Sequence, residues 1–194
     1  RIGPAKVRNL LAKFKDISNI LAANISELMQ TEGISKELAS RIRKASSYKD
    51  SIRKSLEKEI KLLEKIGGRI ITVWDDEFPQ LLKKIYDPPL ILYLMGNFDE
   101  MDKYSIAVVG TRQPTNYGKI QTEKIVADLV QQNITIISGL ARGIDSVAHS
   151  SALKNQGRTI AVVGSGLDII YPSENKKLFN EIKERGVIIS EFPP

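Results

Sequence analysis

The single histidine of the chain stands among side chains that could carry out hydrolysis. His149 lies in "SGLARGIDSVAHSSAL", residues 138–153, four residues after Asp145 and directly before Ser150. The segment could be a hydrolase active site or the opening of a phosphate-binding helix. Adjacent residues on a helix point about 100° apart, so His149 and Ser150 cannot act together as base and nucleophile. No G-x-S-x-G motif is present either, which disfavours a serine hydrolase.

We expect structural roles for the ionisable residues of this segment. Gly143 is expected to open a helix with Asp145 in its first turn, where a carboxylate is favoured by the helix dipole and can accept backbone N–H groups. His149 is expected to pack toward a sheet and to be hydrogen-bonded, because no second histidine or thiol is available for catalysis.

Three glycine turns follow apolar segments and could bind an anion. They read "GTRQPTNYG" from Gly110, "SGLARGID" from Ser138 and "GSGLDIIYP" from Gly164. Glycine lets the backbone approach an anion, and a helix that follows offers free N–H groups and the positive end of its dipole. Three such turns on one edge of a sheet predict a wide anion-binding surface.

Two arginines in these turns are candidates for binding phosphate. A guanidinium beside exposed amides, as expected for Arg112, can hold phosphate through two parallel hydrogen bonds, and Arg142 could face the same anion. Both have a plainer alternative. Arg112 could pair with Asp145 or another loop carboxylate, and Arg142 could be solvated or paired with a carboxylate.

Composition and motifs disfavour several kinds of chemistry. The 194 residues include no cysteine and one histidine, which excludes disulfides and thiolate nucleophiles and disfavours a metal site. No turn matches the dinucleotide fingerprint G-x-G-x-x-G or a P-loop, which disfavours NAD binding and ATP hydrolysis. We therefore expect no cofactor, no metal and no catalysis.

The turns belong to alternating strands and helices that begin near residue 67. Apolar, β-branched runs separated by helices predict right-handed crossovers in a buried parallel sheet. We predict an α/β fold for residues 67–194, with a Rossmann-like, mostly parallel sheet and helices on both faces. Ligands gather at the carboxyl ends of such strands, where the glycine turns stand. The predicted strands are 68–74, 105–110, 134–139, 159–164 and 186–191, with an extended segment at 87–96, and the predicted helices are 117–132, 143–155 and 174–185.

Residues 1–66 predict a separate, basic, all-helical domain. Apolar residues recur at helical spacing, and Asp16, Asn24 and Ser35 stand at N-cap positions. The stretch "ISELMQTEGISKELASRIRKA", with a turn at Gly33, is similar to a helix-hairpin-helix element, whose turn and second helix approach a DNA backbone. A protein-binding helical bundle is the alternative. The basic residues placed for phosphate contact are Lys36, Arg41, Arg43 and Lys44.

The net charge of +6 is concentrated in the helical domain. Residues 1–66 hold 15 Lys and Arg against 8 Asp and Glu, whereas residues 67–194 hold 14 against 15. The excess favours an anionic partner, with nucleic acid first, although solvated lysines explain it equally well. No apolar run approaches the roughly 20 residues that cross a bilayer, and the opening residues lack the apolar stretch of a secretory signal. We predict a soluble, cytoplasmic protein without membrane contact.

Four ordered motifs resemble those of the DprA/Smf family of DNA-processing proteins. They are "VVGTRQPTNYG", "SGLARGIDSVAHSSAL", "GRTIAVVGSGLDIIYPSENKKL" and "IISEFPP". The helical start resembles the SAM-like domain of that family, so the resemblance covers nearly the whole chain. It implies a protein that binds and protects single-stranded DNA and helps load the RecA recombinase in natural transformation and recombination.

The resemblance also implies which residues contact DNA. Arg112 matches the arginine of the family's G-[ST]-R motif, which would grip the phosphates, and Lys176 or Lys177 matches a basic contact after "YP". We expect strong salt dependence and slight sequence preference, and Tyr117 or Tyr171 could add stacking. The predicted DNA- or phosphate-binding residues are Gly110, Thr111, Arg112, Tyr117, Gly118, Ser138, Gly139, Arg142, Gly143, Gly164, Ser165, Gly166, Lys176 and Lys177.

The family pattern continues beyond "SEFPP" with an arginine-rich segment. We therefore expect the sequence to be a fragment, truncated at the C-terminal end of this domain. The resemblance implies a homodimer whose surface lies mostly in that later part, so dimerisation or RecA contact is expected to be weakened here.

Two other functions remain as alternatives. A LOG-like phosphoribohydrolase shares a related Rossmann topology and cleaves nucleoside monophosphates, but its "PGGxGTxxE" loop is absent. A protein-binding module without DNA binding is the second alternative.

Overall fold

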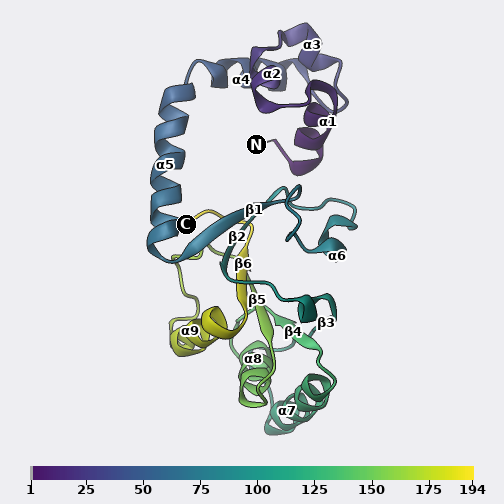
Figure 1. Cartoon of the computed structure of the whole chain (residues 1–194), viewed down its shortest axis with the longest axis vertical. Helices are drawn as coiled ribbons and strands as arrows, with labels where there is room; N and C mark the ends of the chain where they lie inside the picture. The colour runs from purple at the N-terminus through teal and green to yellow at the C-terminus, as the bar shows by residue number, and fades with distance from the viewer. Residues whose placement is uncertain (1) are drawn as a thin grey trace. The chain divides into compact units, whose positions relative to one another are not determined.

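The computed structural model of the chain describes residues 2–194, except for the side chain of Ser46 (Figure 1). The chain forms two compact units. One holds the residues up to Lys58 together with Lys84–Leu90, and the other holds Glu59–Lys83 and Ile91–Pro194. The predicted boundary between residues 66 and 67 lies within the second unit and stays a prediction.

Short helices with polar caps form the first unit. The Asp16 carboxylate accepts hydrogen bonds from two backbone N–H groups, Asn24 and Glu27 form a capping box, and Ser35 Oγ accepts a bond from the first turn of its helix. No helix among residues 2–194 has both the length and the apolar composition that crossing a membrane requires. The helices are α1 (Pro4–Phe14), α2 (Ile17–Ala22), α3 (Ile25–Met29), α4 (Lys36–Ser46) and α5 (Lys49–Lys65), which continues into the second unit.

A small apolar core closes the first unit. Leu28 and Ala39 have no exposed surface. Burying a side chain the size of leucine stabilises a fold by about 1.5–3 kcal/mol, so a few such residues hold these short helices together. The core consists of Leu10, Ile20, Ala23, Leu28, Ile34, Leu38, Ala39 and Ile42.

The second unit is built on one six-stranded sheet in the order β1-β2-β6-β5-β4-β3 (Figure 1). Strands β3 to β6 run parallel, and β2 is antiparallel to both of its neighbours. The predicted α/β fold with a Rossmann-like, mostly parallel sheet is confirmed. The strands are β1 (Gly68–Thr72), β2 (Ile91–Gly96), β3 (Ser105–Ala107), β4 (Thr135–Ser138), β5 (Thr159–Val163) and β6 (Val187–Ser190).

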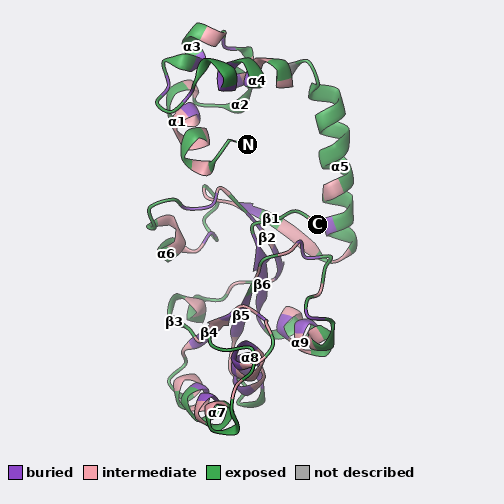
Figure 2. Cartoon of the chain, turned by 180° about the vertical axis from the view of Figure 1, so that it is seen from behind, coloured by how far each residue is buried: buried purple, intermediate pink, exposed green. Residues whose placement is uncertain are grey.

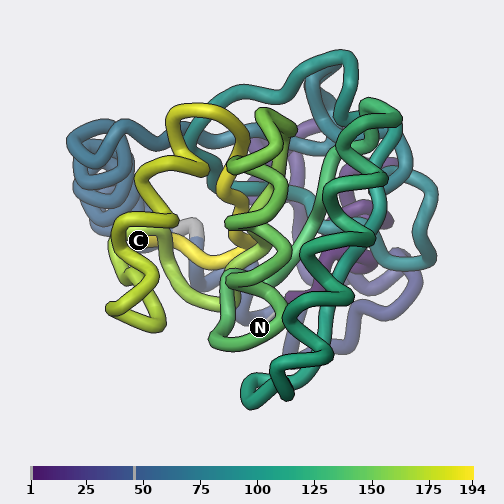
Figure 3. The backbone as a smooth tube through the Cα atoms, turned by 90° about the horizontal axis from the view of Figure 1, so that it is seen from below, coloured from purple at the N-terminus to yellow at the C-terminus, as the bar shows by residue number. Residues whose placement is uncertain are grey.

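Helices lie on both faces of the sheet, as predicted, but one face carries three long helices and the other a short one. On one face Ala161 packs in a cluster with Leu153 and Phe179, and the helices α7, α8 and α9 lie side by side there (Figure 3). On the other face Ile160 belongs to a cluster against which Leu82 of the short helix α6 packs. The helices are α6 (Gln80–Lys83), α7 (Asn116–Gln131), α8 (Ile144–Lys154) and α9 (Lys176–Arg185), with 3-10 turns η1 (Glu100–Lys103) and η2 (Ser173–Asn175).

The central strands are the most buried part of this unit, as Figure 2 shows. Ile136 of β4, Ala161 of β5 and Ile188 of β6 have no exposed surface. Such runs pack on both faces of the sheet, so the strands form a rigid frame for the loops at their ends.

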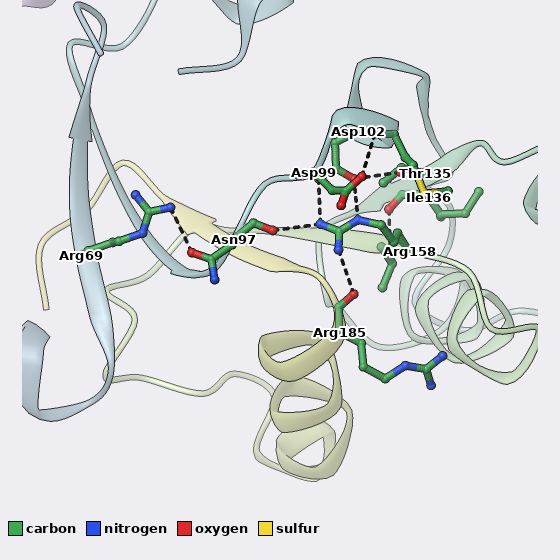
Figure 4. Close-up of polar contacts among 10 residues, drawn as sticks. Arg69, Asn97, Asp99, Asp102, Thr135, Ile136, Arg158 and Arg185 are labelled. Atoms are coloured by element: carbon green, nitrogen blue, oxygen red, sulfur yellow. Dashed lines mark hydrogen bonds and ion pairs between the residues drawn. The ribbon is translucent and has the colours of Figure 1, made fainter. Parts of the chain in front are cut away.

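An ion pair ties the beginnings of the parallel strands together (Figure 4). Arg158, directly before β5, donates from Nε and Nη2 to the carboxylate of Asp102 at 3.0 and 2.8 Å. Asp102 lies in η1, three residues before β3, and also accepts a hydrogen bond from Thr135 Oγ1 of β4 at 2.9 Å. Arg158 further donates to the carbonyl oxygens of Asn97 and Arg185. The hydrogen bonds to Asp102 raise the pKa of the Arg158 guanidinium, so this side chain stays charged.

Candidate nucleic-acid interface

Three loops leave the carboxyl ends of β3, β4 and β5. We name them the first turn (residues 110–115), the second turn (139–143) and the third turn (164–172). Because β3, β4 and β5 are parallel neighbours, these turns share one edge of the sheet. Open α/β sheets bind ligands at this edge.

The first and second turns pack backbone against backbone. Gly143 has a φ of +82°, and a Cβ atom there would lie 2.2 Å from the carbonyl oxygen of Thr111. The backbone N–H of Ile144 donates to the same oxygen at 3.1 Å. A Cβ atom on Gly110 would lie 2.7 Å from the Ile144 side chain. Glycine at 110 and 143 therefore permits an approach that no other residue allows.

Asp145 holds the second turn together from inside. Its buried Oδ2 accepts hydrogen bonds from the backbone N–H groups of Gly139 at 3.2 Å and Ala141 at 3.4 Å. The carboxylate therefore faces its own turn and does not pair with Arg112. The Arg112 side chain is exposed and has no hydrogen bond or ion pair with any residue from 2 to 194.

Arg142, in the second turn, is paired with a carboxylate. Its Nε donates to Glu174 Oε1, and its Nη2 donates to Glu174 Oε2 at 3.2 Å. The pair is open to solvent, with 59% of the arginine side chain and 51% of the glutamate side chain exposed. The hydrogen bond to Glu174 raises the pKa of Arg142, and the same bond lowers the pKa of the Glu174 carboxyl. The carboxylate-paired alternative is therefore the arrangement of Arg142 in this structure.

The third turn is partly closed by its own contacts. Gly164 is exposed, with no atom within 4 Å of the position a Cβ would take. Ser165 Oγ donates to the carbonyl oxygen of Ile169 at 3.1 Å. Gly166 is buried, and a Cβ there would lie 2.4 Å from the carbonyl oxygen of Pro193. Gly164 is thus the member of this glycine pair that a ligand can reach.

Two other predicted contact residues are engaged inside the protein. Ser138 is buried and its Oγ donates to the carbonyl oxygen of Val108 at 2.7 Å. The backbone N–H of Gly118 donates to Thr115 Oγ1, the N-cap of α7, at 3.1 Å. Both hydrogen bonds shape the turns, and neither group is free for phosphate.

The predicted aromatic and lysine contacts are exposed. Tyr117, at the start of α7, has 73% of its surface exposed. Lys176 and Lys177 are exposed in the first turn of α9. Lys177 Nζ lies 3.9 Å from the carboxylate of Glu181, one helical turn further on. These three side chains are accessible to a ligand, and so is the side chain of Arg112 in the first turn.

His149 lies in the interior, against the sheet. It has no exposed surface, and its Nδ1 lies 2.6 Å from Thr159 Oγ1. The same hydroxyl lies 2.8 Å from the carbonyl oxygen of Ile136, so Thr159 links the imidazole to β4. The Nε2 atom has no partner among residues 2–194. Burial lowers the pKa of His149 to about 4, so the ring is neutral at physiological pH.

Two residues of the edge were missed by sequence reasoning. Asn175 Nδ2 donates to the carbonyl oxygen of Leu140 at 2.9 Å and to Ser146 Oγ at 2.8 Å, which ties η2 to the second turn. Glu174 pairs with Arg142, as described above. Both follow "YP" in "YPSEN", directly before α9, where polar residues ordinarily read as helix caps. The Asn175 side chain does not cap α9.

The hairpin of the first unit has the predicted turn. Gly33 has a φ of +79°, between α3 and α4. Lys36, Arg41 and Lys44 are exposed. Arg43 differs, because its Nη1 donates to the carbonyl oxygen of Leu21 at 2.8 Å and so helps to hold the helices together. Contact of this unit with DNA stays a prediction.

Two family models match the chain. The model of DNA recombination-mediator protein A matches residues 69–194, and that of the SAM-like helix-hairpin-helix tandem matches residues 1–46. The two matches cover the sheet and the helical hairpin, respectively.

Curated relatives share the DprA or Smf name. Protein Smf of Synechocystis is 37% identical over 196 residues, which cover 99% of this chain and 48% of that protein. DNA processing protein DprA of Streptococcus pneumoniae is 42% identical over 123 residues, which cover 63% of this chain and 43% of that protein. The chain thus spans about half the length of these relatives, or less.

Two solved structures are similar to the fold. The X-ray structure of DNA processing protein A from Streptococcus pneumoniae matches with a TM-score of 0.78 and 30% identity, over 97% of this chain and 62% of that one. A Helicobacter pylori structure, titled for the single-stranded DNA binding mode of its DNA processing protein A, matches with a TM-score of 0.57 and 34% identity, over 65% and 57% of the two chains. On the family model, the relatives and the fold together, the chain belongs to the DprA/Smf family of DNA recombination-mediator proteins.

Proposed function

We propose that this chain binds single-stranded DNA at the edge formed by its three turns and that it catalyses no reaction there. The observation that carries the proposal is the state of Arg112. Its side chain is exposed, it has no partner among residues 2–194, and its backbone is packed against Gly143. An unpaired guanidinium on a backbone fixed in this way can bind phosphate through two hydrogen bonds.

The remaining contacts suit a single strand. Lys176 and Lys177 add exposed cations, and the ring of Tyr117 offers a face on which a base can stack. Phosphate contact and stacking tolerate any sequence, so we expect slight sequence preference. DNA processing protein A of Helicobacter pylori, a relative that binds single-stranded DNA, supports this assignment.

The wider activities belong to the same proposal. Protection of incoming DNA, loading of the RecA recombinase, homodimer formation and a cytoplasmic location are what membership in the family implies for the whole protein. They concern a protein of which this chain spans part of the length.

The test is a comparison of single and double strands. We expect labelled oligo(dT) to bind more tightly than a duplex of equal length in fluorescence anisotropy, with log Kd rising linearly with log salt concentration. Equal affinity for both forms, or no binding in low salt, would contradict the proposal and favour a protein-binding module.

The enzymatic alternative has its own readout. A LOG-like phosphoribohydrolase would release free base from nucleoside monophosphates, and we expect chromatography to show intact nucleotide after prolonged incubation. Released base would overturn the non-catalytic assignment.

A further inference from the structure

The Glu174 carboxylate occupies the part of Arg142 that a phosphate would use. Nε and Nη2 form one edge of the guanidinium, and both donate to Glu174. A carboxylate and a phosphate bind such an edge in the same two-point manner. A DNA phosphate can therefore use this edge of Arg142 only after Glu174 has left it.

The structure holds Glu174 in this position. It lies in η2, and the next residue, Asn175, is fixed to the second turn by a hydrogen bond to Leu140 and to α8 by one to Ser146. The backbone of Glu174 is therefore anchored beside Arg142. About half of each side chain remains exposed, so water can reach the pair and the side chains can separate without backbone movement.

Arg112 and Arg142 thus differ in availability at the same edge. Arg112 has no partner among residues 2–194, whereas Arg142 is paired. The hydrogen bond from Arg142 lowers the pKa of the Glu174 carboxyl, so this competitor stays ionised at neutral and weakly acidic pH. Among the other charged groups here, Lys176 and Lys177 are cations, and Asp145 is buried on its own amides.

We propose that Glu174 is a built-in anionic competitor that the phosphates of single-stranded DNA must displace from the Nε and Nη2 edge of Arg142. The inference rests on the proposed function, whose binding site it shares. Glu174 would set the affinity of the edge below the value that its arginines alone would give. The second arginine contact would then form only where a phosphate outcompetes the carboxylate.

A double-mutant cycle tests the proposal. The variants are Glu174→Gln, Arg142→Ala and the double variant, titrated with labelled oligo(dT) at moderate salt. We expect Glu174→Gln to tighten binding about three- to fivefold, the scale of an exposed ion pair. In the Arg142→Ala background the same change should have less than about half of that effect in free-energy terms.

The controls separate the two proposals. Glu100→Gln removes the same charge from another exposed ion pair, with Lys103, at the opposite end of β3, and should leave affinity unchanged. Glu174→Ala is a second variant that should act in the same direction, and thermal unfolding confirms the fold of each protein. Binding by the unmodified chain with no gain in either Glu174 variant, or an equal gain without Arg142, would overturn this inference alone. An unmodified chain that does not bind DNA would instead overturn the proposed function and this inference with it.

Discussion

Gly143 lies directly against the backbone of Arg112. A Cβ atom at position 143 would lie 2.7 Å from the carbonyl carbon of Arg112 and 2.8 Å from its Cα, closer than real Cβ atoms come to other atoms. The φ of Gly143, +82°, is one that side chains other than hydrogen rarely permit. The conformation of Arg112 thus depends on the absence of a side chain on a residue 31 positions away in the sequence.

The first prediction concerns this contact. Gly143→Ala should destabilise the fold by about 2–3 kcal/mol, because the strained φ and the clash with the first turn act together. Urea unfolding measures the change, and oligo(dT) affinity should fall as the first turn moves. Gly164→Ala is the matched control, since nothing lies within 4 Å of its Cβ position. Equal stability of the two variants would show that the close contact between the first and second turns does not stabilise the fold.

The sequence predicted the elements that carry strong local signals. The β-branched run at 159–164 became β5 (Thr159–Val163), and the helix predicted at 143–155 became α8 (Ile144–Lys154). It did not predict the position of β2 between β1 and β6, because strand order depends on pairing between distant segments. For the same reason the glycine turns were found but the partner of Arg142 was not. Glu174 is 32 residues further along the chain, and only the folded sheet brings the two together.

The second prediction concerns Asp145. Asp145→Asn should lower the free energy of unfolding by about 1–2 kcal/mol, because the buried oxygen then accepts the N–H groups of Gly139 and Ala141 without its charge. Chemical denaturation checks the value. An unchanged free energy of unfolding would indicate that the charge of Asp145 does not stabilise the second turn.

The third prediction is a pH dependence that His149 causes. Its pKa is about 4 in the folded chain, against an ordinary value of 6.5 for an unperturbed histidine. Between these values the unfolded state binds more protons, so stability falls as the pH is lowered. From pH 7 to pH 5 this histidine alone should remove about 2 kcal/mol.

A variant isolates the contribution of His149. His149→Asn keeps a hydrogen-bond donor near Thr159 but cannot titrate, so its stability should fall less between pH 7 and pH 5 than that of the unmodified chain. If both proteins lose the same free energy of unfolding between pH 7 and pH 5, measured by urea unfolding at each pH, the burial of a neutral ring is contradicted.

The fourth prediction concerns the ion pair of Asp102 with Arg158, at the beginnings of the parallel strands. Asp102→Ala should destabilise the fold by about 3 kcal/mol, because it leaves Arg158 without its carboxylate in a largely buried position. Glu100→Ala, in the same 3-10 turn but exposed, is the control and should change stability by less than about 0.5 kcal/mol. If both variants lose a similar free energy of unfolding, the hydrogen bonds between Asp102 and Arg158 do not stabilise the sheet specifically.

The measurement that tests the central claim most directly is the affinity of Arg112→Ala for single-stranded DNA. We expect oligo(dT) binding to weaken about five- to tenfold at moderate salt and the salt slope to fall by about one, with unchanged thermal stability. Lys154→Ala removes an exposed cation at the far end of α8 and should bind as the unmodified chain does. If Arg112→Ala binds as tightly as Lys154→Ala, the edge formed by the three turns is not the DNA-binding site.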